Sequence, residues 1–576
     1  EPGKFMWTRE ESLSSVISTE MVDLPVSKIM AKMEDEFGVE GCVSLCIYIY
    51  VCVYVLCDVF FIIFIDDGDD DDNDTLDETY LTRDEFNLHK LIIAVTSAGK
   101  IFGIDSNSGK NIWKIYVEDL SPYKVMSGQH VLPLFVQRSS SHFPHQPLCT
   151  VIGRSKATGK SMIFSFHPIS GTPTTYESSS SEDTPPSTSS SLRGNLLPYK
   201  VTNAIMLAQF DVHFLHPLLL IDDQNKVHVV PSSAFEQVRK LSSSLFTFIA
   251  DGAKGSVDGF RLVPARDGLW AQSTWSVDVG ASGQTISAVY SKHPNEHVHS
   301  IGIVLEDRSV LYKYLNPNLI VVVTEGEDAE QKETLQKGVF SVHLIDGVTG
   351  DLIFHCVHRK ARGPVNLIHS ENWIVYSYWN QKHRRNELAV LELYEGERQS
   401  NASAFSSLHH PPQPIVMRQA YIFPSHITTL GVSMTEKGLT NKEILFAMES
   451  GSILGLPKVF IDPRRPEVVS PESREEGLIP YMPELPKPAD RIINYYQLVH
   501  DIRHIKTAPS GLESTSLVFC FGLDLFFTRV TPSKMFDVLK EDFDYFFISS
   551  VLIGMIVVSI VSQKLAQRKL LHRAWK

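Results

Sequence analysis

The sequence predicts an all-β protein: a β-propeller with incomplete quinoprotein-type repeats, followed by a single C-terminal transmembrane helix. Three observations support this fold class. Short β-branched or aromatic segments separated by turn residues follow one another between Leu91 and Leu393. Two distant turns share one residue frame, as the repeats of a propeller do. A long run without charged residues lies near the C-terminus, and it has the length of a membrane span.

The composition is that of a globular protein that buries sizeable cores. The chain has 576 residues, of which 43% are hydrophobic and 21% charged, and its net charge is −14. About half of this charge is local, because residues 66–74 hold seven aspartates. Phosphate binding needs a concentrated positive patch, so nucleic acid is not expected as a partner. Four of the seven cysteines lie in residues 42–57, so cysteine usage does not fix the redox compartment.

The first 38 residues carry helical signals. Thr8 and Glu11 have the spacing of a capping box ahead of Leu13, and further apolar residues recur at helical spacing. We therefore interpret residues 1–38 as a helical segment. The chain begins without the charged and apolar regions of a signal peptide, so we expect a mature piece or a fragment of a longer protein.

Residues 39–75 form an insertion of unusual composition. They contain an apolar run, Gly41 to Ile65, and the aspartates that follow it. The Tyr, Ile, Val and Cys residues of this run are what a repeated TA/TG dinucleotide encodes, and repeated GAT would give the aspartates. We favour a translated non-coding repeat, that is, a gene-model artefact. A second transmembrane helix and a buried strand are the alternatives.

Residues 76–456 form the predicted propeller region. Its strand candidates are short, and few helical patterns separate them. A Ser/Pro-rich loop, residues 177–191, interrupts the region. The strand candidates are Leu91–Thr96, Lys100–Ile104, Asn111–Val117, Met162–Phe166, Leu218–Ile221, Lys226–Val230, Ile301–Leu305, Val310–Tyr314, Leu319–Thr324, Val339–Ile345, Leu352–Val357, Trp373–Tyr378 and Leu388–Leu393.

The shared turn frame consists of Ile-Asp, then Gly, then an aromatic residue four positions later. It occurs in residues 104–113 and 345–354, and a weaker copy runs from His167 to Gly171. In this frame we expect Asp to accept hydrogen bonds within a tight turn and Gly to take the left-handed conformation. The aromatic residue is expected to pack the returning strand.

Two further regions follow the propeller region. Eight prolines from Pro457 to Pro488 predict an extended belt over residues 457–490, because proline excludes regular helix and central strand. Residues 491–530 contain a closing β-hairpin, with strands at 516–521 and 525–530. We expect this hairpin to complete the propeller immediately above the membrane.

The C-terminal residues carry the membrane signal. Residues 531–544 fit an amphipathic juxtamembrane helix. Residues 545–562 contain no charge and, at roughly 1.5 Å per helical residue, are just long enough to cross a membrane. The tail, residues 563–576, has five Lys or Arg residues and no acid, whereas acids precede the run. The positive-inside rule places this tail in the cytosol. A buried core helix is the alternative.

Two segments come close to known phosphate-binding and calcium-binding motifs without matching them. Residues 153–161 resemble a phosphate loop, but the spacing of their glycines is one residue too long and a strand follows. Residues 67–78 resemble a calcium loop that lacks its Gly. We therefore predict no catalytic residue, no cofactor and no enzyme.

Histidine pairs and one glycosylation motif complete the candidates. His297 and His299 would share a strand face, and His355 and His358 are close in sequence, but no Cys or carboxylate cluster accompanies either pair. No metal site is predicted. Asn401 begins an Asn-Ala-Ser sequon in a polar loop, and it is the predicted glycosylation site.

Nine uninterrupted strings carry a family resemblance: Trp7–Glu11, Arg83–Leu88, Ile345–Gly350, His369–Trp373, Val390–Gly396, Asp462–Pro466, Thr507–Thr515, Phe536–Lys540 and Leu570–Lys576. They resemble subunit 1 of the endoplasmic reticulum membrane protein complex, and the similarity covers nearly the whole chain apart from residues 39–74. Asn401 matches a sequon position of that family. The family chain is much longer, and it has an amphipathic interface helix where this chain has residues 39–74.

The resemblance implies a non-enzymatic, lumenal scaffold subunit in a complex that inserts tail-anchored and multipass proteins. It implies a single-pass type I protein of the endoplasmic reticulum membrane. Expected partners are other subunits of the complex, the lipid bilayer, client membrane proteins and lumenal chaperones. One alternative is a quinone-dependent dehydrogenase-like propeller, although many of those enzymes have an adjacent cysteine pair that this sequence lacks. The other is a single-pass lumenal sensor, for which the 14-residue tail is too short to hold a kinase.

Overall fold

The computed structural model describes most of the propeller region and the C-terminal helix. The described residues are 10–26, 81–124, 129–142, 145–174, 192–266, 268–280, 283–327, 338–399, 405–409, 411–533, 536–537 and 545–575. The insertion at 39–75, Asn401 and most of the predicted juxtamembrane helix lie outside them. The chain divides into two compact units, Glu1–Ser533 and Lys534–Lys576.

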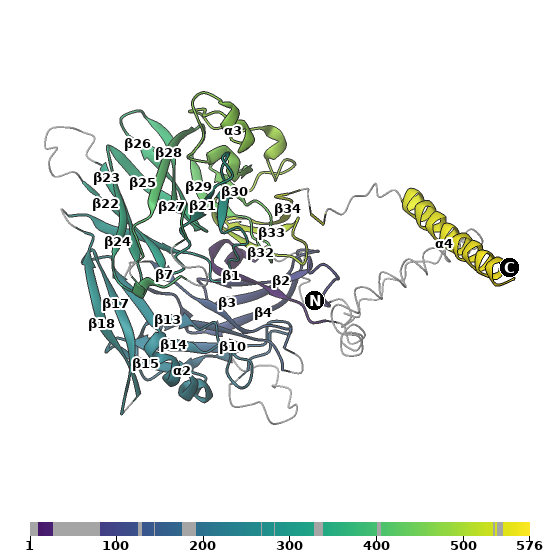
Figure 1. The fold of residues 1–576 in the computed structure, drawn as a ribbon. Coiled ribbons are helices and arrows are strands. Elements are labelled where there is room, and N and C mark those ends of the chain that lie inside the picture. Colours follow the sequence, from purple (N-terminus) through teal and green to yellow (C-terminus); the bar gives the residue numbers. More distant parts are fainter. Residues whose placement is uncertain are drawn as a thin grey trace, which may run out of the picture. The chain divides into compact units, whose positions relative to one another are not determined.

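The first unit is a β-propeller of seven sheets, here called blades 1 to 7 (Figure 1). Blade 1 contains β1 (Val16–Asp23), β2 (Lys90–Thr96), β3 (Lys100–Asp105), β4 (Asn111–Glu118) and β11 (Leu192–Arg193). Blade 2 contains β5 (Leu120–Ser121), β8 (Leu134–Arg138), β9 (Leu148–Ser155), β10 (Ser161–Phe166) and β12 (Asn195–Leu196). A two-stranded ribbon, β6 (Tyr123–Lys124) and β7 (His130–Val131), lies outside the blades.

Blade 3 consists of two three-stranded halves that join through the short pairing of β15 with β18. Its strands are β13 (Val201–Met206), β14 (Leu218–Asp222), β15 (Lys226–Val230), β16 (Phe246–Asp251), β17 (Ser256–Ala265) and β18 (Gly268–Asp278), and the short helix α2 (Phe235–Leu241) packs on it. Blade 4 contains β19 (Thr285–Ser291), β22 (Leu319–Glu327), β23 (Gly338–Asp346) and β24 (Leu352–Arg359).

The last three blades come from the C-terminal half of the unit. Blade 5 contains β20 (Gly302–Val304), β21 (Val310–Lys313), β25 (Ala361–Ser370), β26 (Trp373–Asn380), β27 (Arg385–Gly396) and β28 (Ile415–Phe423). Blade 6 contains β29 (Ile427–Val432), β30 (Glu443–Met448) and β31 (Ile453–Pro457). Blade 7 contains β32 (Ile502–Pro509), β33 (Ser516–Gly522) and β34 (Leu525–Val530), so the predicted closing hairpin is present.

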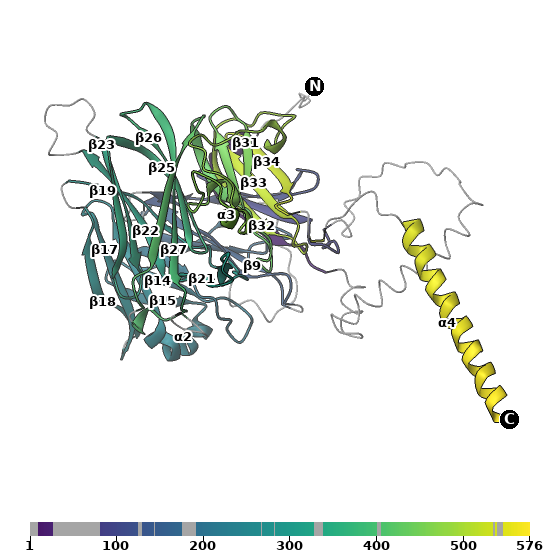
Figure 2. The same ribbon diagram turned by 45° about the horizontal axis from the view of Figure 1, so that its top comes forward.

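The buried apolar side chains close the blades into a ring. Six hydrophobic clusters are each shared by two consecutive blades, from blades 1 and 2 through to blades 6 and 7. A further cluster joins Ile92 and Phe102 of blade 1 to Phe519 and Phe521 of blade 7. Figures 1 and 2 show these two blades side by side. The ring therefore buries strand faces that isolated sheets would expose.

The N-terminal segment differs from the prediction. Residues 10–26 were expected to be helical, but they form one 3-10 turn, Glu11–Ser15, and then strand β1. Glu10 caps the turn by accepting from the Ser12 amide. β1 then pairs with β2 along its length and buries Val16, Thr19 and Val22. Pairing and burial contributed by a distant strand therefore outweigh the local helix signal.

The Pro-rich belt contains one short helix, which the prolines were expected to exclude. Helix α3 (Pro471–Glu475) begins after Ser470, whose side chain accepts from the Ser473 amide. Proline is tolerated here because it occupies the first helical turn, where an amide has no intrahelical partner. The belt also pairs with β28 at one point, where the Leu485 amide donates to the Ile422 carbonyl at 3.0 Å.

The predicted turn frame is confirmed. Asp105 accepts from the Asn107 and Ser108 amides, and Asp346 accepts from the Val348 and Thr349 amides. Gly109 and Gly350 have φ values of 68° and 78°, in the left-handed region that favours glycine.

The second unit contains the C-terminal helix. Helix α4 runs from Tyr545 to Ala574, so it extends beyond the predicted span through the basic tail. Its segment Ser549–Arg573 is long and apolar enough to cross a membrane, and an 18-residue window within it has a mean hydropathy of 1.7. The extension is consistent with the high helix propensity of Leu, Lys, Arg and Gln in the tail.

Candidate functional site

The chain leaves the propeller at one end of the blades, and we call this end the exit face. At this end Val530 pairs with Ser516, which in turn pairs with Pro509 at the end of β32. The chain leaves the propeller after Val530. The start of β2 lies at the same face, because the Gly511 amide, just after β32, donates to the Phe86 carbonyl at 2.7 Å. The end of β1 pairs with the start of β2, and the end of β8 lies beside it, since the Ser140 hydroxyl donates to the Asp23 carbonyl at 2.7 Å.

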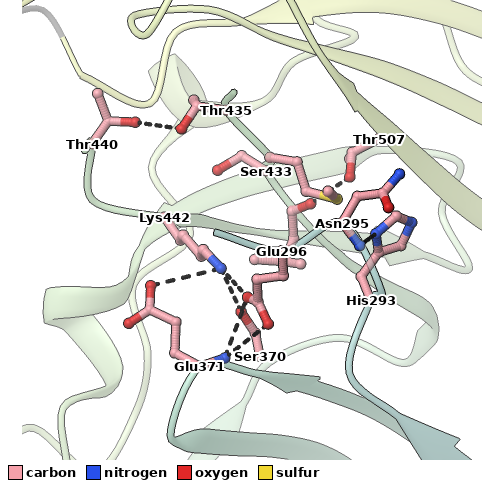
Figure 3. Close-up of polar contacts among 12 residues, drawn as sticks. His293, Asn295, Glu296, Ser370, Glu371, Ser433, Thr435, Thr440, Lys442 and Thr507 are labelled. Carbon is pink, nitrogen blue, oxygen red and sulfur yellow. Dashed lines mark hydrogen bonds and ion pairs between the residues drawn. The ribbon is translucent and has the colours of Figure 1, made fainter. Parts of the chain in front are cut away.

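A buried cluster of charges lies at the exit face where blades 4, 5 and 6 meet (Figure 3). Glu296 forms an ion pair with Lys442 and accepts from the Ser370 hydroxyl and the Glu371 amide. Lys313 binds the Glu371 carboxylate at 2.7 Å. The four charged side chains are at most 14% exposed. Two lysines therefore balance two carboxylates in a site with little water.

The residues of the cluster come from connections rather than from strand interiors. Glu296 lies on the strap, residues 292–301, which connects β19 of blade 4 to β20 of blade 5. Glu371 lies in the turn after β25, and Lys442 immediately precedes β30. Gly438 lets the neighbouring loop approach the strap, because a Cβ there would lie 2.2 Å from the His297 carbonyl oxygen. Glu296 thus fastens the strap across two blades.

Burial alters the ionisation of the cluster. Burial lowers the pKa of Lys292 to about 8, and its ammonium donates to the Asn316 carbonyl at 2.8 Å. Burial opposes ionisation of Glu371, but the Lys313 and Lys442 charges outweigh it, so its pKa is lowered. Burial holds the pKa of His369 well below its usual value, and neither ring nitrogen has a hydrogen-bond partner. The cluster is thus suited to holding the loops together.

A second polar group lies between blades 4 and 5, and of its members only His358 was a candidate in the sequence. The ring of His358 lies 2.7 Å from the Tyr376 hydroxyl, and the Cys356 sulfur lies 3.4 Å from the same hydroxyl. A cysteine nucleophile needs a thiolate beside an imidazolium. Here burial raises the pKa of Cys356 and lowers the pKa of His358 to about 4, so both groups are neutral near pH 7. The arrangement is therefore a packing contact between neutral side chains in the core, not that of a cysteine nucleophile.

The histidine pairs of the sequence analysis do not converge. His297 and His299 lie exposed in the strap and not on one strand face. His355 and His358 lie three residues apart on β24 and so on opposite faces of the strand; His355 is exposed and His358 is half-buried. Within the described ranges no three His, Cys, Asp or Glu side chains are grouped to hold a metal ion. Residues 153–161 form the β9–β10 hairpin, and the residues of the calcium-like pattern lie outside the description.

Comparison with known proteins identifies one family. Residues 87–533 match the family described as ER membrane protein complex subunit 1, second beta-propeller. A Gallus gallus protein named ER membrane protein complex subunit 1 is 44% identical over 586 residues, covering 100% of this chain and 57% of its own length. The Xenopus laevis protein of that name is 44% identical over 586 residues, with 100% and 56% covered. That of Schizosaccharomyces pombe is 31% identical over 352 residues, with 60% and 38% covered.

Proposed function

Because this chain belongs to the family of ER membrane protein complex subunit 1, we propose that it is a non-enzymatic scaffold subunit that supports insertion of tail-anchored and multipass membrane proteins. The chain spans little more than half the length of its vertebrate relatives, 57% and 56%. The proposed partners are the other subunits of the complex, the lipid bilayer, client membrane proteins and lumenal chaperones. No cofactor is required by this role.

The observation that carries the proposal is the joining of a closed propeller to one apolar helix with a basic end. Segment 549–573 is suited to spanning a membrane, and its C-terminal part is rich in Lys and Arg. Basic residues are retained on the cytosolic side of membranes. The proposed topology is therefore single-pass type I in the endoplasmic reticulum membrane, with a lumenal propeller and a cytosolic C-terminus.

Protease protection tests this topology. A protease added to intact microsomes should trim only the C-terminal end and leave the propeller, detected with an antibody against blades 3 to 5, at its full size. Detergent should then make the propeller accessible, which controls for protease activity. Loss of the propeller in intact microsomes would reverse the proposed orientation.

The proposed scaffold role gives the propeller and the membrane-spanning helix different tasks. Residues 545–562 contain no charged side chain, so they offer no charged path for the polar end of a client. The propeller, in contrast, is closed by the packing of blade 1 on blade 7. We therefore expect the propeller to hold lumenal partners and the helix to anchor them.

Two variants of the full chain test this division in cells that lack the native protein. Replacing residues 545–562 by an unrelated apolar span of equal length should leave partner recovery largely intact. Deleting β33 and β34 should abolish it, because the open ring exposes strand edges and loses a shared core. Partner recovery and insertion of a tail-anchored reporter are measured for both. Loss of partners on span replacement, with the deletion tolerated, would falsify the scaffold assignment.

A further inference from the structure

We infer that the loop of residues 208–216, which connects β13 to β14, touches the lipid surface of the membrane directly. Three apolar side chains at its tip face solvent: Phe210 is 43% exposed, Val212 74% and Phe214 47%. This inference rests on the proposed anchoring by α4 and adds a second contact, made by the propeller itself. We call residues 208–216 the aromatic loop.

Hydrogen bonds to Asp211 hold the aromatic loop in a defined conformation. The buried Asp211 carboxylate accepts from the His213 amide at 2.8 Å, from the Leu215 amide at 2.9 Å and from the Ser233 hydroxyl at 3.1 Å. Phe214 has a φ of 56°, a left-handed conformation that is costly for an aromatic residue. Such a conformation persists when surrounding contacts enforce it, and it is common at functional sites. Asp211 therefore holds an apolar tip in the solvent at an energetic cost.

Aromatic contacts support the tip from the neighbouring loop. The ring of His142 lies 4.9 Å from that of Phe210 and 5.4 Å from that of Phe214, measured between centroids. The two phenylalanine rings lie 6.5 Å apart. The two exposed phenylalanine rings and the half-buried ring of His142 thus form one patch on two loops, which favours a common binding partner over isolated exposed residues.

The aromatic loop lies on the exit face. The His216 amide donates to the Gln137 carbonyl at 2.8 Å, and the Arg138 guanidinium donates to the His213 carbonyl at 2.9 Å. These residues end β8, whose end meets β1 at the exit face through Ser140 and Asp23. The loop therefore lies on the face from which the chain leaves toward its apolar helix.

The length of the connection limits how far this face can lie from the membrane. Fourteen residues, 531–544, separate the end of β34 from the start of α4. A fully extended chain covers at most about 3.3–3.6 Å per residue, so this connection reaches roughly 50 Å. A face that is tethered this closely to a membrane helix encounters lipid at high effective concentration.

The charges of the loop suit lipid better than a protein partner. Its single acid, Asp211, is buried and satisfied, so no exposed carboxylate of the loop repels anionic headgroups. The neighbouring Arg138 carries a positive charge beside the tip. Phenylalanine on a basic or neutral surface is typical of shallow interfacial binding. A stable protein interface needs about 800 Å² from each partner, more than three side chains on a narrow tip supply.

Photo-crosslinking in the full chain tests the inference. Phe214 is replaced by p-benzoylphenylalanine, and the protein is expressed in cells, assembled in microsomes containing radiolabelled phospholipid, and irradiated. A phospholipid adduct is expected. The matched control is Leu523, which is 52% exposed in the turn between β33 and β34, at the opposite end of blade 7 from the exit. No phospholipid adduct is expected there.

The outcomes separate this inference from the proposed function. Carbonate extraction of the same microsomes reports the anchor: retained protein without a lipid adduct at either position 214 or position 212 overturns only the lipid contact. Extracted protein overturns both. A discrete protein adduct at position 214 would assign the loop to a protein partner instead. Since a new side chain at the left-handed Phe214 can disturb the loop, the same label at Val212 provides a second variant, and a lipid adduct there with none at Leu523 supports the inference.

Discussion

Trp275 of blade 3 lies against Gly350 of blade 4. Its indole N–H donates to the Val348 carbonyl at 3.0 Å, and a Cβ on Gly350 would lie 2.5 Å from the Trp275 ring. The same arrangement joins blades 1 and 2: the Trp113 indole donates to the Pro168 carbonyl at 3.0 Å and covers Gly171. The turn frame is therefore a contact point at which one blade packs against the next.

We predict that Gly350→Ala destabilises the propeller more than its backbone conformation alone explains. A left-handed φ costs an alanine about 1–2 kcal/mol. Contact with the Trp275 ring adds an overpacking cost of about 1–3 kcal/mol. The control is Gly159→Ala, since Gly159 has a φ of 68° and no atom within 4 Å of an added Cβ. Thermal unfolding of the detergent-solubilised full chain measures both, and equal losses would contradict the docking role.

The turns were predictable because their signal is local, whereas the docking was not. Asp and Gly within a few residues of each other specify the turn. Trp113 lies over Gly103 of its own hairpin, as predicted. Its indole also docks on the turn of another blade, 55 residues away at Pro168, which the local pattern did not indicate. The ion pair of Glu296 and Lys442 joins residues 146 positions apart, so no periodic sequence pattern could predict it.

Two other features escaped prediction for different physical reasons. The strands β17 and β18 are half-exposed and polar on one face, so they lack the apolar runs that mark buried strands. The aromatic loop depends on a left-handed Phe214, a conformation that sequence patterns assign to Gly or Asn. The closing hairpin and the apolar helix were found because both are long, uniform and local signals.

The second prediction concerns the buried cluster: Glu296→Gln should destabilise the propeller strongly. The change leaves Lys442 with only the Glu371 carboxylate, at 3.6 Å, which Lys313 already binds. Removing one partner of a buried ion pair costs about 3–5 kcal/mol. Replacing both residues, as Glu296→Leu with Lys442→Met, should be less harmful than the single change because it removes both buried charges. Thermal unfolding of the full chain gives the comparison.

The matched control for the buried pair is an exposed one. Glu236 and Arg239 pair at 3.7 Å on α2, and both side chains are at least half exposed. Glu236→Gln should therefore change stability by only about 0–1 kcal/mol. A similar small change for Glu296→Gln would show that the cluster does not secure the strap.

The third prediction is that half-buried histidines on the two faces of blade 4 make the propeller sensitive to acid. Burial lowers the pKa of His343 and of His358 from 6.5 to about 4. Between these values the unfolded chain binds protons that the folded chain does not, so stability falls as the pH drops from 6.5 toward about 4. Above pH 6.5 these two groups contribute no pH dependence.

His358→Gln tests the origin of this acid sensitivity. Glutamine keeps an acceptor for the Tyr376 hydroxyl, which lies 2.7 Å from the His358 ring, but it does not bind a proton in this range. The thermal midpoint of the variant should fall less steeply below pH 6.5 than that of the wild-type chain. Parallel curves for the two proteins would assign the acid sensitivity to other groups.

The last prediction concerns Asn401, whose sequon lies outside the described residues. Oligosaccharide transfer requires lumenal exposure of an Asn-x-Ser/Thr motif. Under the proposed topology the segment is lumenal, so Asn401→Gln should remove one glycosidase-sensitive glycan and increase gel mobility. Ser403→Ala should give the same shift, because it destroys the motif while keeping the asparagine. Ser403→Thr preserves the motif and should leave the glycan in place. Unchanged mobility in the first two variants would remove this support for a lumenal propeller, whereas a shift in all three would indicate an effect unrelated to the sequon.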